Sequence, residues 1–297
     1  MIKPLTQIAN LTTEQFMTEH WHVKPFLFRQ AFPNFEPLCD LDTIAEMASD
    51  EDIESRLIQY GKNGWTLEQG PFDELPPMKK KAWTVLIQGI DHHLPEAYDL
   101  LQLFRFIPDA RLDDIMLSLA SDGGGVGPHY DSYDVFLLQM HGKRRWKIGP
   151  LLNKELEEGV PLKILKEFEP TEEFVLEPGD MLYLPPRYAH DGIAEGECMT
   201  YSIGFRAPAR AELAQELLGR LAEDAGEDGP SLMYRDATQA AVAQPAAIPA
   251  QLQDFAREAL SRALTQPLVL ERALGEYLTE PKSNVWFEPG AAGVMLE

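Results

Sequence analysis

The segment between Ile115 and Phe205 constrains the fold of this chain more than any other feature of its sequence. Short apolar runs, some alternating with polar residues, follow one another there and are separated by turn residues, which is the pattern of antiparallel strands. We expect strands near residues 115–120, 135–140, 144–148, 173–176, 181–184 and 199–205. The turn sequences His141-Gly142 and Glu-Pro-Gly-Asp at 177–180 predict hairpins between neighbouring strands. These strands predict a mainly β fold, a jelly roll or double-stranded β-helix that closes around a small pocket.

Helical patterns precede the predicted strands. Thr12 and Gln15 have the spacing of a capping box, so we expect a helix to begin there. Apolar residues recur at helical spacing after Asp40, and a further helix is expected over residues 96–106, before Pro108. These helices are expected to support the β region.

The strand pattern stops after Pro208, and leucines then recur at helical spacing. One helix is expected over residues 213–221, and a second helical segment over 255–278 is interrupted at Pro267. An alanine- and proline-rich stretch at 240–249 has the composition of a linker. Apolar helix faces outside a finished β core must be buried, which predicts a helical subdomain or a dimer interface.

Charge and composition narrow the partners and the location. The chain has 26 basic and 48 acidic residues and a formal net charge of −22, which disfavours direct binding of free nucleic acid and favours a basic protein partner. Solubility or a salty habitat would explain the same acidity. No apolar stretch reaches the roughly 18 residues of a membrane helix, and the first residues lack the features of a secretory signal. With only Cys39 and Cys198, far apart, we expect a soluble, cytoplasmic protein with no membrane association.

Two side chains that commonly bind metals stand at positions i and i+2 in the sequence His129-Tyr130-Asp131. On a strand this spacing places both on one face, close enough to bind a single metal ion. His190 follows the second group of strands after a Pro-Pro pair that ends strand pairing, and it is the expected third ligand. Two histidines and one carboxylate form the facial triad of non-haem iron(II) oxygenases, which leaves positions open for a cosubstrate and dioxygen.

An isolated His-x-Asp sequence often arises by chance, so its context matters. Glycines at 123–125 and 127 directly precede His129, and such density marks backbone in unusual geometry or in close contact with another group. This context favours the interpretation as a metal site.

A cosubstrate such as 2-oxoglutarate also needs a cation for its distal carboxylate, because an unpaired buried carboxylate is costly. The candidates are Lys143, Arg144, Arg145 and Lys147. Alternation along the strand places Arg144 with the apolar residues Trp146 and Ile148, so Arg144 is expected to point inward. The alternative is that the whole basic run is an exposed hairpin.

These motifs together resemble a known family. The sequences GGGVGPHYDSYDVFLLQMHGKRRWKIG, EPGDMLYLPPRYAHDGIA and TYSIGFRAP resemble the JmjC-type ribosomal oxygenases, in particular the bacterial ribosomal-protein arginine hydroxylases. The likeness extends from WHVKPFLFRQAF near the N-terminus to LTEPKSNVWFEPG near the C-terminus. Their combination is far more specific than any one motif.

The resemblance implies three regions. Residues 1–207 would form a JmjC double-stranded β-helix of the cupin kind with N-terminal helical elements, and residues 208–280 a helical dimerisation region, which implies a homodimer. Residues 281–297 would be the truncated start of a winged-helix domain. Members of the bacterial branch hydroxylate an arginine at its β-carbon in the sixteenth protein of the large ribosomal subunit, and animal relatives hydroxylate histidine.

The resemblance also assigns roles to residues. His129, Asp131 and His190 match the family's ligands for Fe(II), and Arg144 matches the arginine that binds 2-oxoglutarate. Asp122 would pair with the substrate guanidinium, although a turn acid at the same place is an equal alternative.

The reaction class expected from these residues couples decarboxylation of 2-oxoglutarate to succinate with hydroxylation by dioxygen. The same iron chemistry on a histidyl, lysyl or asparaginyl side chain, or on a small molecule, is an alternative. So is a non-catalytic metal-binding cupin that acts as an interaction module. A zinc or manganese isomerase is disfavoured, since it requires neither Arg144 nor open metal positions.

Overall fold

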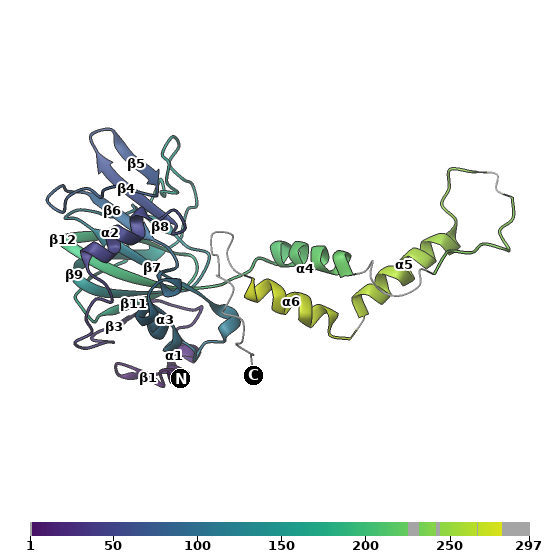
Figure 1. The fold of residues 1–297 in the computed structure, drawn as a ribbon, viewed down its shortest axis with the longest axis horizontal. Helices are drawn as coiled ribbons and strands as arrows, with labels where there is room; N and C mark the ends of the chain where they lie inside the picture. Colours follow the sequence, from purple (N-terminus) through teal and green to yellow (C-terminus); the bar gives the residue numbers. More distant parts are fainter. Residues whose placement is uncertain (1, 225–231, 242–243, 266, 281–297) are drawn as a thin grey trace, which may run out of the picture. The chain divides into compact units, whose positions relative to one another are not determined.

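The computed structural model describes residues 2–224, 232–241, 244–265 and 267–280 (Figure 1). The chain divides into two compact units, with the boundary between Ala207 and Pro208. The proposed winged-helix start at 281–297 lies outside the described residues, as do residues 242–243 of the expected linker.

The first unit is built on one antiparallel sheet whose strand order is β3-β11-β9-β12-β7-β6-β4-β5. In addition, β10 pairs with β9 and β8 pairs with β12, which confirms the mainly antiparallel β fold expected from the sequence. The strands are β3 (Phe26–Phe28), β4 (Ser55–Gly61), β5 (Gly64–Gln69), β6 (Trp83–Ile87), β7 (Leu112–Ala120), β8 (His129–Tyr130), β9 (Val135–Pro150), β10 (Glu172–Leu176), β11 (Met181–Leu184) and β12 (Tyr188–Phe205). A separate small sheet joins β1 (Gln7–Ile8) and β2 (Leu11–Thr12).

Two long strands, β9 and β12, each pair with different strands along their two halves. The first part of β9 pairs with β11 and its last part pairs with β10. Likewise, the last part of β12 pairs with β7, whereas its first part pairs with β8. Side chains from both parts of β9, Val135 and Leu137 from the first and Trp146 and Ile148 from the second, meet in one buried cluster. The two parts of β9 therefore face one another across an interior.

The hairpin predicted at His141-Gly142 is wrong. β9 runs through this position without interruption, and its register with β12 shifts between Glu195 and Met199. Gly142 has a φ of 61°, and a Cβ built on it would lie 1.9 Å from the Glu197 carbonyl oxygen. The glycine is required because the backbones of β9 and β12 approach closely at the bulge, where β9 changes its partner from β11 to β10.

The second predicted hairpin, at residues 177–180, is also wrong. β10 and β11 do not pair with each other but bind consecutive parts of β9. The turn between them bridges the bulge, since Gly179 N–H donates to the Gln139 carbonyl at 2.9 Å and Gln139 N–H donates to the Asp180 carbonyl at 2.9 Å. Turn residues here mark an irregularity within a ladder, and short-range sequence cannot distinguish this from a chain reversal.

Helices α1 (Thr13–Glu19), α2 (Leu41–Ser49) and α3 (Pro95–Gln102) supply apolar residues to one face of the sheet, together with the 3-10 turn η1 (Ile90–His92), whereas the 3-10 turn η2 (Asp109–Arg111) buries none of its residues. The capping box of Thr12 and Gln15 is present as predicted. α3 ends at Gln102, earlier than the expected residue 106. The strands of this N-terminal region, β1 to β6, carry no individual prediction from the sequence.

The two faces of the long strands differ in composition. Phe136, Leu138 and Tyr201 belong to a large cluster with Phe16 and Phe104, which we call the helix-side core. Phe136 has its ring centroid 5.3 Å from that of Phe16 and 5.1 Å from that of Phe104. The opposite face lines what we call the barrel interior, which contains the buried cluster of Val135, Leu137, Trp146, Ile148, Leu176, Leu182 and Leu184 and the buried polar residues Ser118, Gln139, Arg144, His190 and Thr200.

The second unit contains α4 (Arg210–Asp224), α5 (Ala250–Thr265) and α6 (Val269–Thr279), so the predicted helices are confirmed (Figure 1). Leu221 of α4 packs against Val269 and Ala273 of α6. Large apolar side chains of α5 and its neighbourhood remain exposed, namely Ile248, Leu252, Leu260, Leu264, Leu268 and Leu270. None of the described helices is long and apolar enough to cross a membrane.

Candidate metal centre

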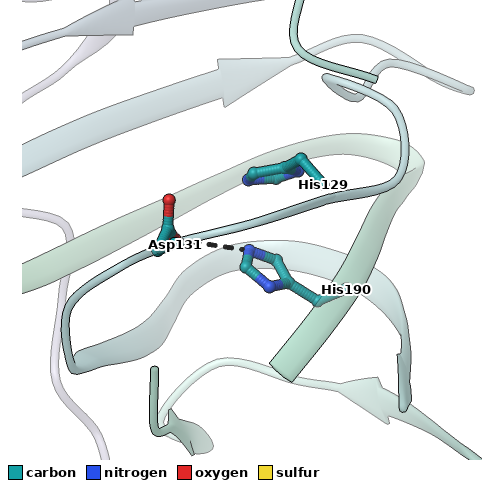
Figure 2. Close-up of side chains that lie close together, drawn as sticks. All are labelled: His129, Asp131 and His190. Atoms are coloured by element: carbon teal, nitrogen blue, oxygen red, sulfur yellow. Dashed lines mark ion pairs between the residues drawn. The ribbon is translucent and has the colours of Figure 1, made fainter. Parts of the chain in front are cut away.

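Strand pairing places two histidines next to each other. β8 is only two residues long, and its pairing with β12 sets His129 directly across from His190. Asp131 follows two residues after His129, so its side chain projects to the same side (Figure 2). The three predicted ligands, 61 positions apart at the extremes of sequence (129 to 190), thus converge on one point.

The ligand atoms lie at distances suited to one ion. One ligand atom from each of His129, Asp131 and His190 can be chosen so that all lie within 4.8 Å of one another. His190 Nε2 is 3.6 Å from Asp131 Oδ2, and the two imidazole ring centroids are 4.2 Å apart. Two nitrogens and one carboxylate oxygen gathered in this way fit the facial triad that binds iron(II).

Backbone carbonyls orient both imidazole rings. His129 Nδ1 lies 2.9 Å from the Gly127 carbonyl oxygen, and His190 Nδ1 lies 3.1 Å from the Tyr188 carbonyl oxygen. A carbonyl can only accept, so each Nδ1 carries the proton and each Nε2 keeps a lone pair for a metal. Both rings are therefore fixed in the tautomer that metal binding requires.

The electrostatic environment keeps His190 neutral. Burial, and after it the neighbouring His129, lower the pKa of His190 to about 4 against the opposing effect of Asp131. Neutral imidazole is the form that ligates a metal. The site is thus prepared for a cation near neutral pH.

Tyr133 supports the carboxylate ligand. Its hydroxyl forms a hydrogen bond with Asp131, and burial followed by the Asp131 charge raises the pKa of Tyr133. The hydroxyl therefore stays protonated and donates to the carboxylate, which orients it.

The glycine run explains how the chain reaches the site. A Cβ on Gly125 would lie 2.6 Å from the Gly192 carbonyl oxygen, so the backbone before β8 runs in close contact with β12. Gly123 N–H donates to the Ala194 carbonyl at 2.9 Å and continues the pairing. Gly127 has a φ of 78°, which turns the chain just before His129.

Arg144 points into the barrel interior, as alternation predicted. Arg144 is 4% exposed, and its neighbours on the same face, Trp146 and Ile148, are 5% and 0% exposed. Arg145 on the other face is partly exposed and pairs with Glu173 and Glu195. The basic run is therefore not an exposed hairpin.

The guanidinium of Arg144 has only neutral protein partners. Its Nη2 donates to Ser118 Oγ at 3.1 Å, and its Nε donates to Cys198 Sγ at 3.3 Å. Among the residues that the structure describes, no carboxylate lies within ion-pair distance of it. A buried cation without a counter-ion is unfavourable, so this arrangement fits an anionic ligand.

Sequence reasoning missed these two partners of Arg144. Ser118 comes from β7 and Cys198 from β12, which are 26 and 54 positions away from Arg144. No local pattern joins residues at such separations. The alternation that places Ser118 on the inner face of β7 was the one available signal.

Asp122 lies away from the triad's ligand contacts and is already paired. Its Oδ2 is 2.7 Å from Lys81 Nζ, and its Oδ1 accepts a hydrogen bond from Gly196 N–H at 3.0 Å. The bond from Lys81 lowers the pKa of Asp122, so its carboxylate is ionised. The structure does not bring it together with the other candidate residues.

Comparison with known proteins gives consistent matches. Residues 99–213 match the model of the JmjC domain family. The ribosomal protein uL16 3-hydroxylase of Escherichia coli is 34% identical over 94% of this chain and 74% of that protein. A probable ribosomal oxygenase of Haemophilus influenzae is 37% identical over 69% of this chain and 52% of its own length.

A solved structure shares the architecture as well. The ribosomal oxygenase YcfD of Escherichia coli, in complex with cobalt and 2-oxoglutarate, superposes with a TM-score of 0.75 at 33% identity. The match covers 91% of this chain and 72% of that one. Its cobalt and 2-oxoglutarate are the kinds of ligand that a facial triad and a buried arginine would bind.

Proposed function

This chain belongs to the family of JmjC-domain ribosomal oxygenases, and we propose that it hydroxylates an arginine side chain at the β-carbon in the large-subunit ribosomal protein uL16. It is an enzyme of the Fe(II)- and 2-oxoglutarate-dependent dioxygenase class, with dioxygen as second cosubstrate. The single observation that carries the proposal is the convergence of His129, Asp131 and His190 in a fold that also buries Arg144 with no counter-ion among the described residues.

His129, Asp131 and His190 would hold the iron. The metal supplies the redox chemistry by which dioxygen, with 2-oxoglutarate as reductant, yields succinate, carbon dioxide and one oxygen atom for the substrate C–H bond. The chain itself contributes aim and orientation. The carbonyls of Gly127 and Tyr188 hold the two imidazoles, and Tyr133 holds the Asp131 carboxylate.

Arg144 would bind the distal carboxylate of 2-oxoglutarate. It is buried, carries a permanent charge and has hydrogen bonds only to the hydroxyl and thiol of Ser118 and Cys198. A guanidinium binds a carboxylate through two parallel hydrogen bonds, which fixes the direction of the cosubstrate. Beside Arg144, the small side chains of Ala120, Ala194 and Cys198 form a buried cluster.

The charge of the chain suits a basic ribosomal protein. A net charge of −22 attracts a cationic partner and speeds its encounter. We propose Asp122 as a contact for the substrate guanidinium, which would have to replace Lys81 as its partner. A ribosomal substrate also implies action in the cytoplasm.

We further propose that the helical unit mediates a homodimer. The exposed leucines Leu252, Leu260 and Leu264 on α5 support this, because apolar helix faces are normally covered. Multi-angle light scattering of the full chain should report a dimer, and Leu260→Glu combined with Leu264→Glu should report a monomer. A wild-type monomer would contradict the proposal.

The decisive experiment uses the full chain, reconstituted anaerobically with iron(II) and 2-oxoglutarate. Air is then admitted in the presence of a uL16 peptide, and tandem mass spectrometry locates any added oxygen. One added oxygen on arginine, together with succinate release, supports the proposal. An added oxygen on a histidine or another side chain would show that the target residue is not arginine, while the reaction class would stand.

Metal binding with no peptide oxidation and no succinate would instead favour a cupin that acts as an interaction module. A peptide with the target arginine changed to lysine serves as the substrate control. Asp122→Asn serves as the test of the substrate contact, with an expected rise in KM for the peptide and an unchanged affinity for 2-oxoglutarate.

A further inference from the structure

One buried polar group of the barrel interior has no hydrogen-bond partner in the part of the chain that the structure describes. Trp146 is only 5% exposed. Its indole Nε1 is fully buried and makes no hydrogen bond with any described residue. Buried donors are nearly always paired, and each unpaired one costs on the order of 1–3 kcal/mol. Such an orphan needs a partner from outside the chain.

Trp146 lies between the metal ligands and Arg144. Its ring centroid is 5.8 Å from that of His190, and the Arg144 Cζ is 5.8 Å from the centroid of the Trp146 ring. Strand register gives the same order, since His190, Gly192 and Ala194 of β12 face Ile148, Trp146 and Arg144 of β9. A molecule that joins the metal to Arg144 must pass along Trp146.

Gly192 makes room for the indole. A Cβ on Gly192 would lie 2.6 Å from Cη2 and Cζ3 and 2.8 Å from Cε3 of Trp146, so the six-membered ring occupies the space that a side chain at residue 192 would need. Nε1 belongs to the five-membered ring and is not among the three atoms nearest to that position. The missing side chain at residue 192 therefore makes room for the six-membered ring against β12, while the Nε1 donor has no hydrogen-bond partner among the described residues.

We propose that the Trp146 indole N–H donates a hydrogen bond to an oxygen of 2-oxoglutarate and, with the ring as a side wall, positions the cosubstrate between the metal and Arg144. Trp146 is thus a positioning and specificity-determining residue for the acid, and Gly192 is the residue that makes room for it. This inference rests on the proposed function, because the acceptor is the cosubstrate of that reaction.

The direct test observes the N–H itself by NMR. The full chain, labelled with 15N and loaded with diamagnetic zinc(II) in place of iron, is titrated with 2-oxoglutarate. The indole proton of Trp146, assigned by its absence in Trp146→Phe, should move downfield on saturation. The indole of Trp83 is the internal control and should stay in place, because its Nε1 already donates to the Pro77 carbonyl at 3.3 Å.

The second measurement is calorimetric affinity for 2-oxoglutarate. Trp146→Phe keeps an aromatic ring and removes the donor, so binding should weaken about ten- to hundredfold, as expected for loss of a hydrogen bond to a charged group. Trp83→Phe, the matched control at another buried indole, should bind as wild type does. Zinc affinity should be unchanged in both variants.

The outcomes separate the two hypotheses. If 2-oxoglutarate saturates the wild-type protein while the Trp146 proton stays in place, or if Trp146→Phe binds it equally well, the role of Trp146 is overturned and the proposed function stands. If the zinc-loaded wild-type protein does not bind 2-oxoglutarate at all, both are overturned. The NMR measurement uses the wild-type fold and so holds even if Trp146→Phe folds poorly.

Discussion

The helix-side core and the barrel interior lie on opposite faces of the same strands, yet they are built in opposite ways. On β9, Phe136 and Leu138 face the first and Leu137 and Gln139 face the second. The helix-side core is apolar and aromatic, whereas the interior also buries Ser118, Gln139, Arg144, His190 and Thr200. One face stabilises the fold, and the other accepts buried polar groups whose partners include the ligands they bind.

The largest expected effect is the loss of metal binding when a ligand of the triad is removed, compared with an acidic residue beside the triad. Asp131→Ala removes a ligand, so metal affinity and hydroxylation should fall by more than the roughly 100-fold that loss of an outer-sphere partner costs. Calorimetry with iron(II) under anaerobic conditions and the peptide assay both measure this. Asp191→Asn, next to His190 but outside the triad, is the control and should retain metal binding; equal losses in the two variants would contradict the assignment.

A change in the helix-side core should affect stability and leave the site chemistry intact. Phe136 is fully buried among aromatic rings, so Phe136→Ala should cost about 3–5 kcal/mol of unfolding free energy. Urea denaturation measures the loss. At a temperature where the variant stays folded, its affinity for 2-oxoglutarate should match that of wild type; a large loss of affinity would show that the two faces are not independent.

A change in the barrel interior should have the opposite result, a loss of cosubstrate affinity without a loss of stability. Arg144→Met removes a buried cation without a protein carboxylate, so stability should be unchanged or higher. Affinity for 2-oxoglutarate should fall by at least about 30-fold, because the distal carboxylate loses its buried partner. Arg145→Met is the matched control on the outer face, where Arg145 pairs with Glu173 and Glu195. Strong destabilisation of Arg144→Met would place the residue among structural groups.

The smallest expected effect concerns the bulge at Gly142, where the pairing of β9 and β12 is irregular. Gly142→Ala combines a φ of 61° with a Cβ placed 1.9 Å from a backbone oxygen, so about 1–3 kcal/mol of strain is expected. Gly159→Ala has a similar φ of 77° with nothing within 4 Å, and thermal unfolding should show a smaller loss for it. Equal losses would mean that the close approach at Gly142 relaxes without cost.

Local pattern predicted much of this comparison. The spacing of His129 and Asp131 and the alternation of Arg144, Trp146 and Ile148 are short-range properties, and the structure places these side chains as expected. The capping box at Thr12 and the helices after Pro208 were equally local. Each depends only on the repeat of a strand or helix, which the sequence carries within a few residues.

The same local logic failed at turns. His141-Gly142 and the Glu-Pro-Gly-Asp sequence at 177–180 predicted hairpins, but they form a bulge and the bridge across it. A glycine with positive φ serves both purposes, and which one it serves depends on the strands that pair around it.

The sequence by itself determined the residue types and their faces: two histidines and a carboxylate for iron, and an arginine directed inward. Only the tertiary structure decided that β8 pairs with β12 to join His129 to His190, and that Ser118 and Cys198 meet Arg144. It also decided that the Trp146 indole is left without a partner over Gly192. The physical reason is that strand pairing joins distant segments through backbone hydrogen bonds, which every residue except proline can make, so side-chain pattern alone does not specify the partners.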